Sequence, residues 1–289
     1  MLRMSFLEHL EELRARILRA LMGVGVAFAS SLVFADQLWD FVHGPIMEAL
    51  RTIGVKDPTL IQITPMETFN ILWVKLPILA AVFLSSPWIL YQAWAFIAPG
   101  LYKKERRWAA PFVICSAGLF ILGGLFAYFV AFKFGLAFLL GIGLGKGISP
   151  MITVAEYFDL FINVMLGVGL VFELPVLIFF LTLLRIVTPR FLMANSRYAV
   201  LIIVVLAAII TPTPDVLNLT LFATPMCLLY YVGVFASYLL VLSREKRRFP
   251  WGKVLKWTGV VALMVSGLVY LAVTRYGYHL GWRWPFLTR

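Results

Sequence analysis

The sequence predicts an all-α integral membrane protein that crosses the bilayer several times. Hydrophobic residues make up 62% of the 289 residues and charged residues only 13%, whereas soluble chains are nearer half apolar and a quarter charged. The apolar residues are gathered into long runs, and Lys and Arg are concentrated in alternate segments between those runs, as in multi-span proteins with basic cytoplasmic loops. A soluble domain is therefore excluded. The net charge of +11 indicates topology and not nucleic-acid binding.

Residues 1–16 are predicted to form a cytoplasmic amphipathic helix. The segment from Ser5 to Glu8 has the pattern of a capping box, in which hydroxyl and carboxylate bond the first free amides. Apolar residues then recur at helical spacing, at Phe6, Leu10, Leu13 and Ile17. We expect this helix to lie at the inner interface before the chain turns into the first span. No small-residue cleavage site follows, so the first span itself is expected to target the chain.

Six apolar runs in the predicted membrane domain, residues 17–242, qualify or nearly qualify as spans, because a span needs about 20 apolar residues. They cover about residues 17–35, 69–91, 109–132, 157–184, 198–210 and 216–242. A seventh run at 254–274 is long enough to span by itself. It follows a basic cytoplasmic linker at 243–253 and precedes a tail at 275–289.

The fifth run is too short to cross an ordinary bilayer. Its roughly 13 residues rise about 20 Å, against a hydrocarbon thickness of about 30 Å. It leads into the segment from Thr211 to Asp215, where Pro212 and Pro214 prevent the helix from continuing. The fifth and sixth runs are therefore expected to form a hairpin whose tip lies inside the usual outer boundary of the bilayer and thins it locally.

The basic segments alternate as expected for a cytoplasmic N-terminus. They precede the first run and follow the second, fourth and sixth. Two longer loops with Gly and Pro, 36–68 and 133–156, would then lie outside. The tail would also lie outside although it carries Arg275, Arg283 and Arg289, so the charge rule is weaker there.

The stretch SPWILYQAWAFIAPGLYKKERR, residues 86–107, carries the most specific pattern. An aromatic belt leads through a turn at 98–100 into a cluster of charge, the order expected where a helix emerges on the basic side of a membrane. Glu105 is a lone acid among four cations. It is either paired with its neighbours or kept to bind a cationic guest.

This stretch and the block HLEELRARI, residues 9–17, together resemble the TatC family of twin-arginine protein translocases. Weaker motifs of the family follow in order: GPI at 44–46, AYF at 127–129, FELP at 172–175 and TPTPD at 211–215. The similarity covers residues 5 to 242, most of the chain.

The resemblance implies six family-type transmembrane helices in a concave bundle, in the plasma (inner) membrane, with the N-terminus in the cytoplasm. It further implies a receptor for the twin-arginine signal peptides of folded cargo, which self-associates in a complex and works with the single-span partners TatA and TatB. Transport would be driven by the proton-motive force, by a protein that is not an enzyme and binds no cofactor.

The resemblance assigns Glu12 and Glu105 to the recognition of the two arginines, and places Phe96, Arg14 and Arg16 in the same signal-peptide site. The chemistry agrees, since a carboxylate can clamp the planar guanidinium fork with two parallel hydrogen bonds and Lys fits that geometry poorly. A structural alternative stays open. Glu12 lies four residues before Arg16, a helical pair that contributes about 0.3–0.5 kcal/mol, and Glu105 has cationic neighbours of its own.

Three further residues are expected to contact partners: Glu173, Pro45 and Asp215. Glu173 falls near the middle of the fourth run, where an ionisable group costs about 2.5–3.5 kcal/mol and normally faces a partner or a wet cavity. The alternative is a protonated or hydrogen-bonded packing residue. Pro175 is expected to bend that helix. Asp215 could instead cap the sixth helix, and Pro45 could simply mark a turn.

The chain departs from the family pattern at Leu219, where a glutamine is common, and at Lys133, where a proline is common. Thr220 or Thr224 could replace the missing polar group, and Lys133 could extend outward to water. The seventh run is extra.

A secondary transporter is the alternative function, but it would need more intramembrane charge than Glu173 supplies. No enzyme motif is visible, and Cys115 and Cys227 stand alone in apolar runs, which fits neither a disulfide framework nor a metal site.

Overall fold

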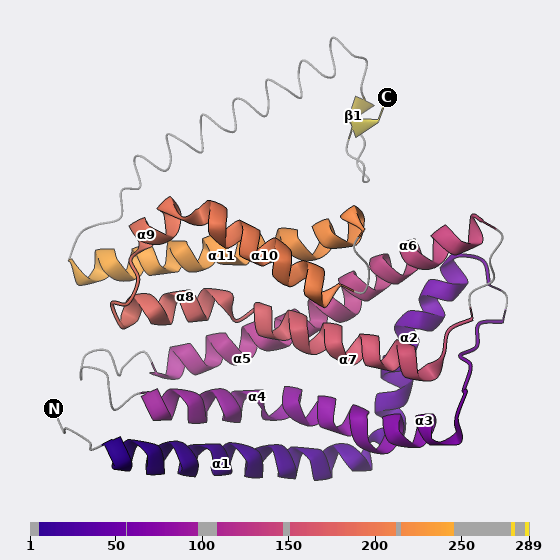
Figure 1. Ribbon diagram of the computed structural model, residues 1–289, viewed down its shortest axis with the longest axis horizontal. Coiled ribbons are helices and arrows are strands. Elements are labelled where there is room, and N and C mark those ends of the chain that lie inside the picture. Colours follow the sequence, from indigo (N-terminus) through magenta and orange to yellow (C-terminus); the bar gives the residue numbers. More distant parts are fainter. Residues whose placement is uncertain are drawn as a thin grey trace. The chain divides into compact units, whose positions relative to one another are not determined.

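The computed structural model describes residues 6–55, 57–97, 109–146, 151–211, 215–245, 279–280 and 287–288. The chain divides into two compact units, residues 1–238 and 239–289, and the helical bundle of the first unit is shown in Figure 1. In the tail, the two-residue strands β1 (His279–Leu280) and β2 (Leu287–Thr288) pair antiparallel. The remaining elements are helices, which confirms the predicted all-α class.

Five helical segments within the described ranges are long and apolar enough to cross a membrane, and a shorter apolar helix accompanies them. The five are Leu7–Val33, Pro65–Ile97, Pro111–Gly143, Val154–Leu183 and Val216–Arg244, and the shorter one is Ser196–Ile210. They match the six runs expected from the sequence. The seventh run at 254–274, and nearly all of the linker at 243–253, lie outside the described residues.

The first helix, α1 (Phe6–Val33), is continuous over 28 residues. The predicted turn between an amphipathic helix at 1–16 and the first span is therefore wrong. No proline interrupts this segment, so nothing in the backbone forces a break. The helix lies along α4 (Leu76–Ile97). Gly23 permits this close packing, because a Cβ there would lie 2.3 Å from Cδ1 of Trp88.

The two predicted outer loops are largely helical, which corrects the interpretation of their Gly and Pro residues as loop signals. The first loop contains α2 (Ala35–Thr52) and α3 (Pro65–Asn70), and the second contains α6 (Lys133–Leu144). Buried apolar residues recur on α2 at helical spacing, at Val42, Ile46, Ala49 and Leu50, which gives this helix a face to pack.

Pro45 lies inside α2 and is buried, so the expected turn at this residue is wrong. A proline inside a helix leaves the carbonyl four residues earlier without its usual donor, here the carbonyl of Phe41. The hydroxyl of Tyr128 donates a hydrogen bond to that oxygen at 2.8 Å. A Cβ at Gly44 would lie 3.3 Å from the same hydroxyl, so the motifs at 44–46 and 127–129 contact each other in the folded chain.

Two spans contain a π-helical turn. The turn η1 (Ile71–Lys75) joins α3 to α4, and η4 (Ala127–Phe132) joins α5 (Ala109–Phe126) to α6. A π-helical turn is a local departure from the regular α-helix and is often found at functional sites. The second of these turns carries Tyr128, the residue that bonds α2.

The fourth span is broken into α7 (Val154–Val171) and α8 (Leu174–Leu183) at Phe172 and Glu173. Pro175 in the first turn of α8 cannot donate to the carbonyl of Val171, which explains the break, so the predicted bend is confirmed. Gly233 of α11 (Val216–Arg244) packs against the start of α8, since a Cβ at Gly233 would lie 2.8 Å from Cα of Pro175.

The fifth span is α10 (Ser196–Ile210), which follows the short helix α9 (Pro189–Ala194). Its 15 residues correspond to about 22 Å of rise, so the predicted shortness is confirmed.

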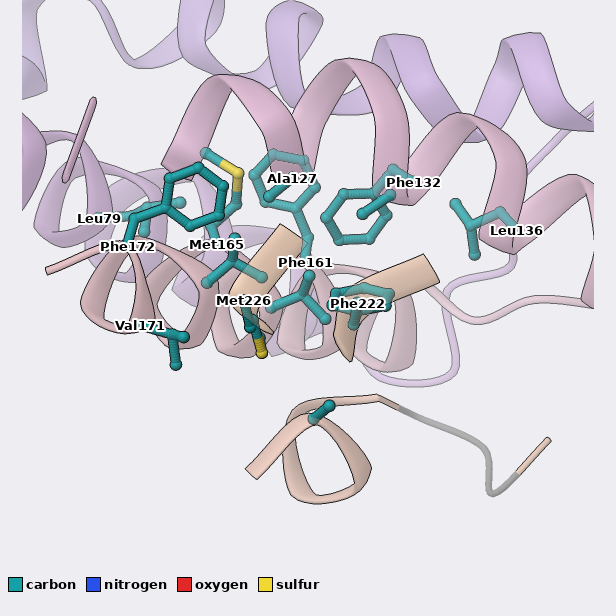
Figure 2. Close-up of a cluster of buried hydrophobic side chains, with 14 of the residues drawn as sticks. Leu79, Ala127, Phe132, Leu136, Phe161, Met165, Val171, Phe172, Phe222 and Met226 are labelled. Atoms are coloured by element: carbon teal, nitrogen blue, oxygen red, sulfur yellow. The ribbon is translucent and has the colours of Figure 1, made fainter. Parts of the chain in front are cut away.

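The buried core is formed by residues of α2, η1, α4, η4, α6, α7, α8, α10 and α11, and part of it is shown in Figure 2. Its centre is aromatic, with the rings of Phe132 and Phe161 stacked at 4.8 Å.

At the α2 end, Ile61 and Thr153 form a parallel β-bridge between the two outer segments. Ion pairs of Lys133 with Glu48 (2.6 Å) and of Lys75 with Asp159 also lie there. Lys133 is thus half exposed and paired.

Candidate functional site

The first candidate site lies where the start of α1 meets the end of α4. Arg16 on α1 donates from Nη2 to Oε1 of Glu12 at 3.4 Å, and from Nη1 to Oε1 of Gln92 on α4 at 3.2 Å. Gln92 is only 3% exposed. The predicted local pair between Glu12 and Arg16 is therefore present, but a second helix also holds the guanidinium.

The carboxylate of Glu12 is incompletely bonded. Its side chain is 16% exposed, and among the described residues no donor reaches the buried atom Oε2. The 3.4 Å contact to Oε1 is longer than a good charge-assisted hydrogen bond, which measures about 2.7–2.9 Å. This mostly buried carboxylate makes few hydrogen bonds, so it can accept more of them from a further cationic side chain.

Phe96 contacts α1 one turn before Glu12. Its ring stacks on the imidazole of His9 at a centroid distance of 4.4 Å and an interplanar angle of 16°. His9 is three residues before Glu12 on α1, and Phe96 is four residues after Gln92 on α4, so all four residues meet at one helix–helix contact. The structure thus brings Glu12, Arg16 and Phe96 together.

The two other predicted residues of this site are Arg14 and Glu105, and Arg14 does not join the cluster. Arg14 is exposed and is rotated about 200° from Glu12 around the axis of α1, since a helix turns about 100° per residue. Glu105 lies in the segment 98–108, outside the described residues.

The second candidate site surrounds Glu173, at the break between α7 and α8. The hydroxyl of Ser116 on α5 donates to Oε2 of Glu173. Oε1 is buried, and within the described part of the chain no donor reaches it. The predicted hydrogen-bonded packing role is thus present in part, and one oxygen stays available.

Asp215 and Pro45 occupy structural positions. Oδ1 of Asp215 accepts from the backbone N–H of Asn218 at 2.8 Å, which is the geometry of an N-cap for α11, so the predicted capping role is confirmed. Pro45 is buried within α2, so it cannot itself present a surface to a partner.

The departures from the family pattern are also placed. Leu219 packs partly buried against the core. The hydroxyl of Thr220 donates to the carbonyl of Val216 in its own helix at 2.6 Å, and Thr224 is exposed. Among the described residues, no cluster of three or more His, Cys, Asp or Glu could hold a metal ion.

Comparison with known proteins identifies the family. The model of the family described as "Sec-independent protein translocase protein (TatC)" matches residues 8–225. The chain belongs to the TatC family. This is a family of protein translocase components, and its members are not known as enzymes.

Relatives in this family extend over most of the chain. The Sec-independent protein translocase protein TatC of Koribacter versatilis is 46% identical over 246 residues, which cover 85% of this chain and 89% of that protein. The TatC of Desulforapulum autotrophicum is 36% identical over 232 residues, or 80% of this chain and 83% of that protein. Both cover enough of each chain to support a shared fold and function.

A solved structure agrees with the fold. The crystal structure of the twin arginine translocase receptor TatC has a TM-score of 0.68 and 33% identity, and the match covers 80% of this chain and 99% of that one. This chain is therefore a polytopic membrane protein of the TatC family.

Sequence reasoning missed three residues that complete these sites: Gln92, His9 and Ser116. All three lie within apolar or amphipathic helices and contact a different helix. A polar residue inside an apolar run was a usable signal for Gln92 and Ser116, because such a residue normally faces a partner.

Proposed function

We propose that this chain binds twin-arginine signal peptides where α1 meets α4, and that with TatA-like and TatB-like single-span partners it exports folded proteins, driven by the proton-motive force. The observation that carries the proposal is the mostly buried carboxylate of Glu12, whose Oε2 has no donor among the described residues. In a TatC-family protein, such a carboxylate can bind a cationic side chain of a signal peptide.

An arginine suits this site better than a lysine. The guanidinium offers parallel N–H groups that match both carboxylate oxygens and it is only weakly hydrated, whereas an ammonium is a compact, strongly hydrated charge. Phe96 and His9 stack one turn before Glu12 and form an aromatic wall for the flanking signal-peptide residues. Glu105 is assigned the second arginine.

Glu173 is proposed to contact a partner helix or the apolar part of the signal peptide. A polar atom buried in the bundle without a bonding partner favours a donor from a neighbouring helix, and Oε1 of Glu173 is such an atom within the described part of the chain. Asp215 and Pro45 would contribute indirectly, by fixing the start of α11 and the path of α2.

The protein is proposed to lie in the plasma (inner) membrane, with the start of α1 in the cytoplasm and with several copies in one complex. Arg185 and Arg190 follow α8, and Arg14 and Arg19 lie in the first half of α1, as the positive-inside rule requires.

A cross-linking experiment tests signal-peptide binding. A twin-arginine signal peptide with a photoreactive residue next to its arginine pair is bound to membranes that contain wild-type protein or the Glu12→Gln variant. Loss of a charge-assisted pair is expected to reduce cross-linking about tenfold or more. The matched control is Glu11→Gln, because Glu11 is the adjacent acid and is exposed.

The two variants carry the same loss of charge on the same helix, so only position distinguishes them. Equal cross-linking in Glu12→Gln and wild type would contradict the proposal. A reporter exported only with a twin-arginine signal then checks transport: Glu12→Gln is expected to leave it in the cytoplasm, and Glu11→Gln to export it.

A further inference from the structure

Arg16 is held by two helices at once. An ordinary helical pair four residues apart lies on the surface and needs no further anchor. Here the Arg16 side chain is only 23% exposed. One nitrogen contacts Glu12, while the other contacts Gln92, a buried residue of α4. The guanidinium is thus placed at the carboxylate by the packing of α1 on α4.

That packing is itself well fixed. The indole of Trp88 on α4 donates to the carbonyl of Arg19 on α1 at 2.9 Å, and its ring lies against Gly23. Both contacts lie within two turns of Arg16. They keep Gln92 within reach of the guanidinium, so the two contacts of Arg16 belong to the resting geometry.

We propose that Arg16 is a resident guanidinium, which occupies the Glu12 carboxylate in the absence of cargo and sets the affinity that a signal peptide must exceed. This inference rests on the proposed binding of signal peptides at Glu12. Arg16 would then determine specificity by competing with the guest, whereas the guest's own arginine would contact Glu12 directly.

The bonding at Glu12 is suited to such an exchange. Arg16 reaches only Oε1, and its contact is long, so it is a weak competitor. Oε2 is buried and the described residues supply no donor for it, so a guest guanidinium that replaces Arg16 at Oε1 can bond both oxygens. Arg16 keeps a hydrogen-bond acceptor after it is displaced, because Gln92 still accepts from Nη1.

The same arrangement disfavours lysine. A guest that lacks a fork gains only one strong contact from the carboxylate, and it must bring a strongly hydrated charge next to the Arg16 guanidinium. An arginine gains two contacts and is more weakly hydrated. Displacing Arg16 costs either guest the same free energy, so only a guest with strong contacts of its own, such as arginine, still binds well.

The test measures the affinity of purified full-length protein in lipid nanodiscs for two synthetic signal peptides, which differ only in an Arg-Arg or a Lys-Lys pair. In Arg16→Gln, both peptides are expected to bind about fivefold more tightly, because the competitor that each of them has to displace is gone. Arg16→Lys keeps the charge but cannot reach Glu12 and Gln92 together, so it is expected to give a smaller gain.

Arg19→Gln is the control, since Arg19 is an exposed cation on the same helix and its loss changes the charge equally. It should leave both affinities unchanged. Size-exclusion profiles and thermal unfolding check that each variant is folded. Should Arg16→Gln not fold, the conservative Arg16→Lys variant carries the test alone.

The outcomes separate this inference from the proposed function. If the wild-type protein binds both peptides equally, signal recognition at Glu12 is itself wrong. If the wild type discriminates and Arg16→Gln binds the Arg-Arg peptide no more tightly than the wild type does, then Arg16 is not a competitor. If Arg16→Lys binds the peptides with the same affinities as the wild type, a positive charge at residue 16 is enough for competition. The proposed role of the planar guanidinium of Arg16 is then overturned.

Discussion

At the scale of single residues, Glu12 and Glu173 each have one bonded oxygen and one oxygen for which the described part of the chain supplies no donor. In Glu12 the bonded oxygen faces Arg16, and in Glu173 it accepts from Ser116. A buried polar atom without a partner costs about 1–3 kcal/mol, so folded proteins keep few of them. Their presence at both candidate sites indicates places where a donor from outside the chain would be favourable.

Ser116 is predicted to stabilise the bundle through its hydrogen bond to Glu173. Ser116→Ala removes the donor described for this carboxylate and should lower the free energy of unfolding by about 1 kcal/mol, the scale of interhelical hydrogen bonds in membranes. Thermal unfolding in detergent measures the change.

Ser30→Ala is the control for that measurement, because the Ser30 hydroxyl is exposed and bonds only the carbonyl of Ala27 in its own helix. Its unfolding temperature should stay close to that of the wild type. Equal unfolding temperatures for Ser116→Ala and Ser30→Ala would show that the hydrogen bond to Glu173 does not hold α5 to α8.

At the scale of elements, α2 shows how a distant residue can keep a helix intact. Pro45 suggested a turn because proline disrupts a helix interior at a cost of about 3 kcal/mol or more. The structure lowers that cost by giving the freed carbonyl of Phe41 a donor, the hydroxyl of Tyr128. The rings of Phe41 and Tyr128 also stack at 4.2 Å.

This compensation could not be predicted from local sequence, because the donor is 87 residues from the acceptor. The spans themselves were predictable, since long apolar runs are governed by bilayer thickness alone. Glu12 and Phe96 were found through family motifs. Gln92 depends on how α1 packs against α4, and no pattern within either helix specifies that contact.

A double-mutant cycle tests the link between Pro45 and Tyr128. Tyr128→Phe leaves the Phe41 carbonyl without the donor that the structure describes, and is expected to lower the free energy of unfolding by about 1–3 kcal/mol. In a Pro45→Ala background the helix can supply its own N–H, so the same change should cost clearly less. Thermal unfolding of the four proteins gives the coupling.

Equal effects of Tyr128→Phe in both backgrounds would contradict the compensation. The stacking with Phe41 is retained in every variant, because phenylalanine keeps the ring, so it does not contribute to the difference.

At the scale of the whole bundle, charge is distributed unevenly between the ends of the spans. Arginines predominate where α1 begins and around α9, at Arg14, Arg16, Arg19, Arg185, Arg190 and Arg197. At the other ends, Lys75 and Lys133 are paired with Asp159 and Glu48. Orientation follows the bias in Lys and Arg, which predicts that the start of α1 and the loop before α10 lie in the cytoplasm.

Cysteine labelling in intact cells tests this orientation. In a background with Cys115→Ala and Cys227→Ala, one cysteine is placed at Asp57 or at Arg190, both of which are exposed. In cells whose outer envelope is permeable and whose inner membrane is intact, a membrane-impermeant maleimide is expected to label Asp57→Cys. It should label Arg190→Cys only after the inner membrane is broken. The reverse pattern would invert the topology and place Glu12 on the side to which twin-arginine cargo is exported. Recognition of the signal peptide at Glu12 would then be excluded as well.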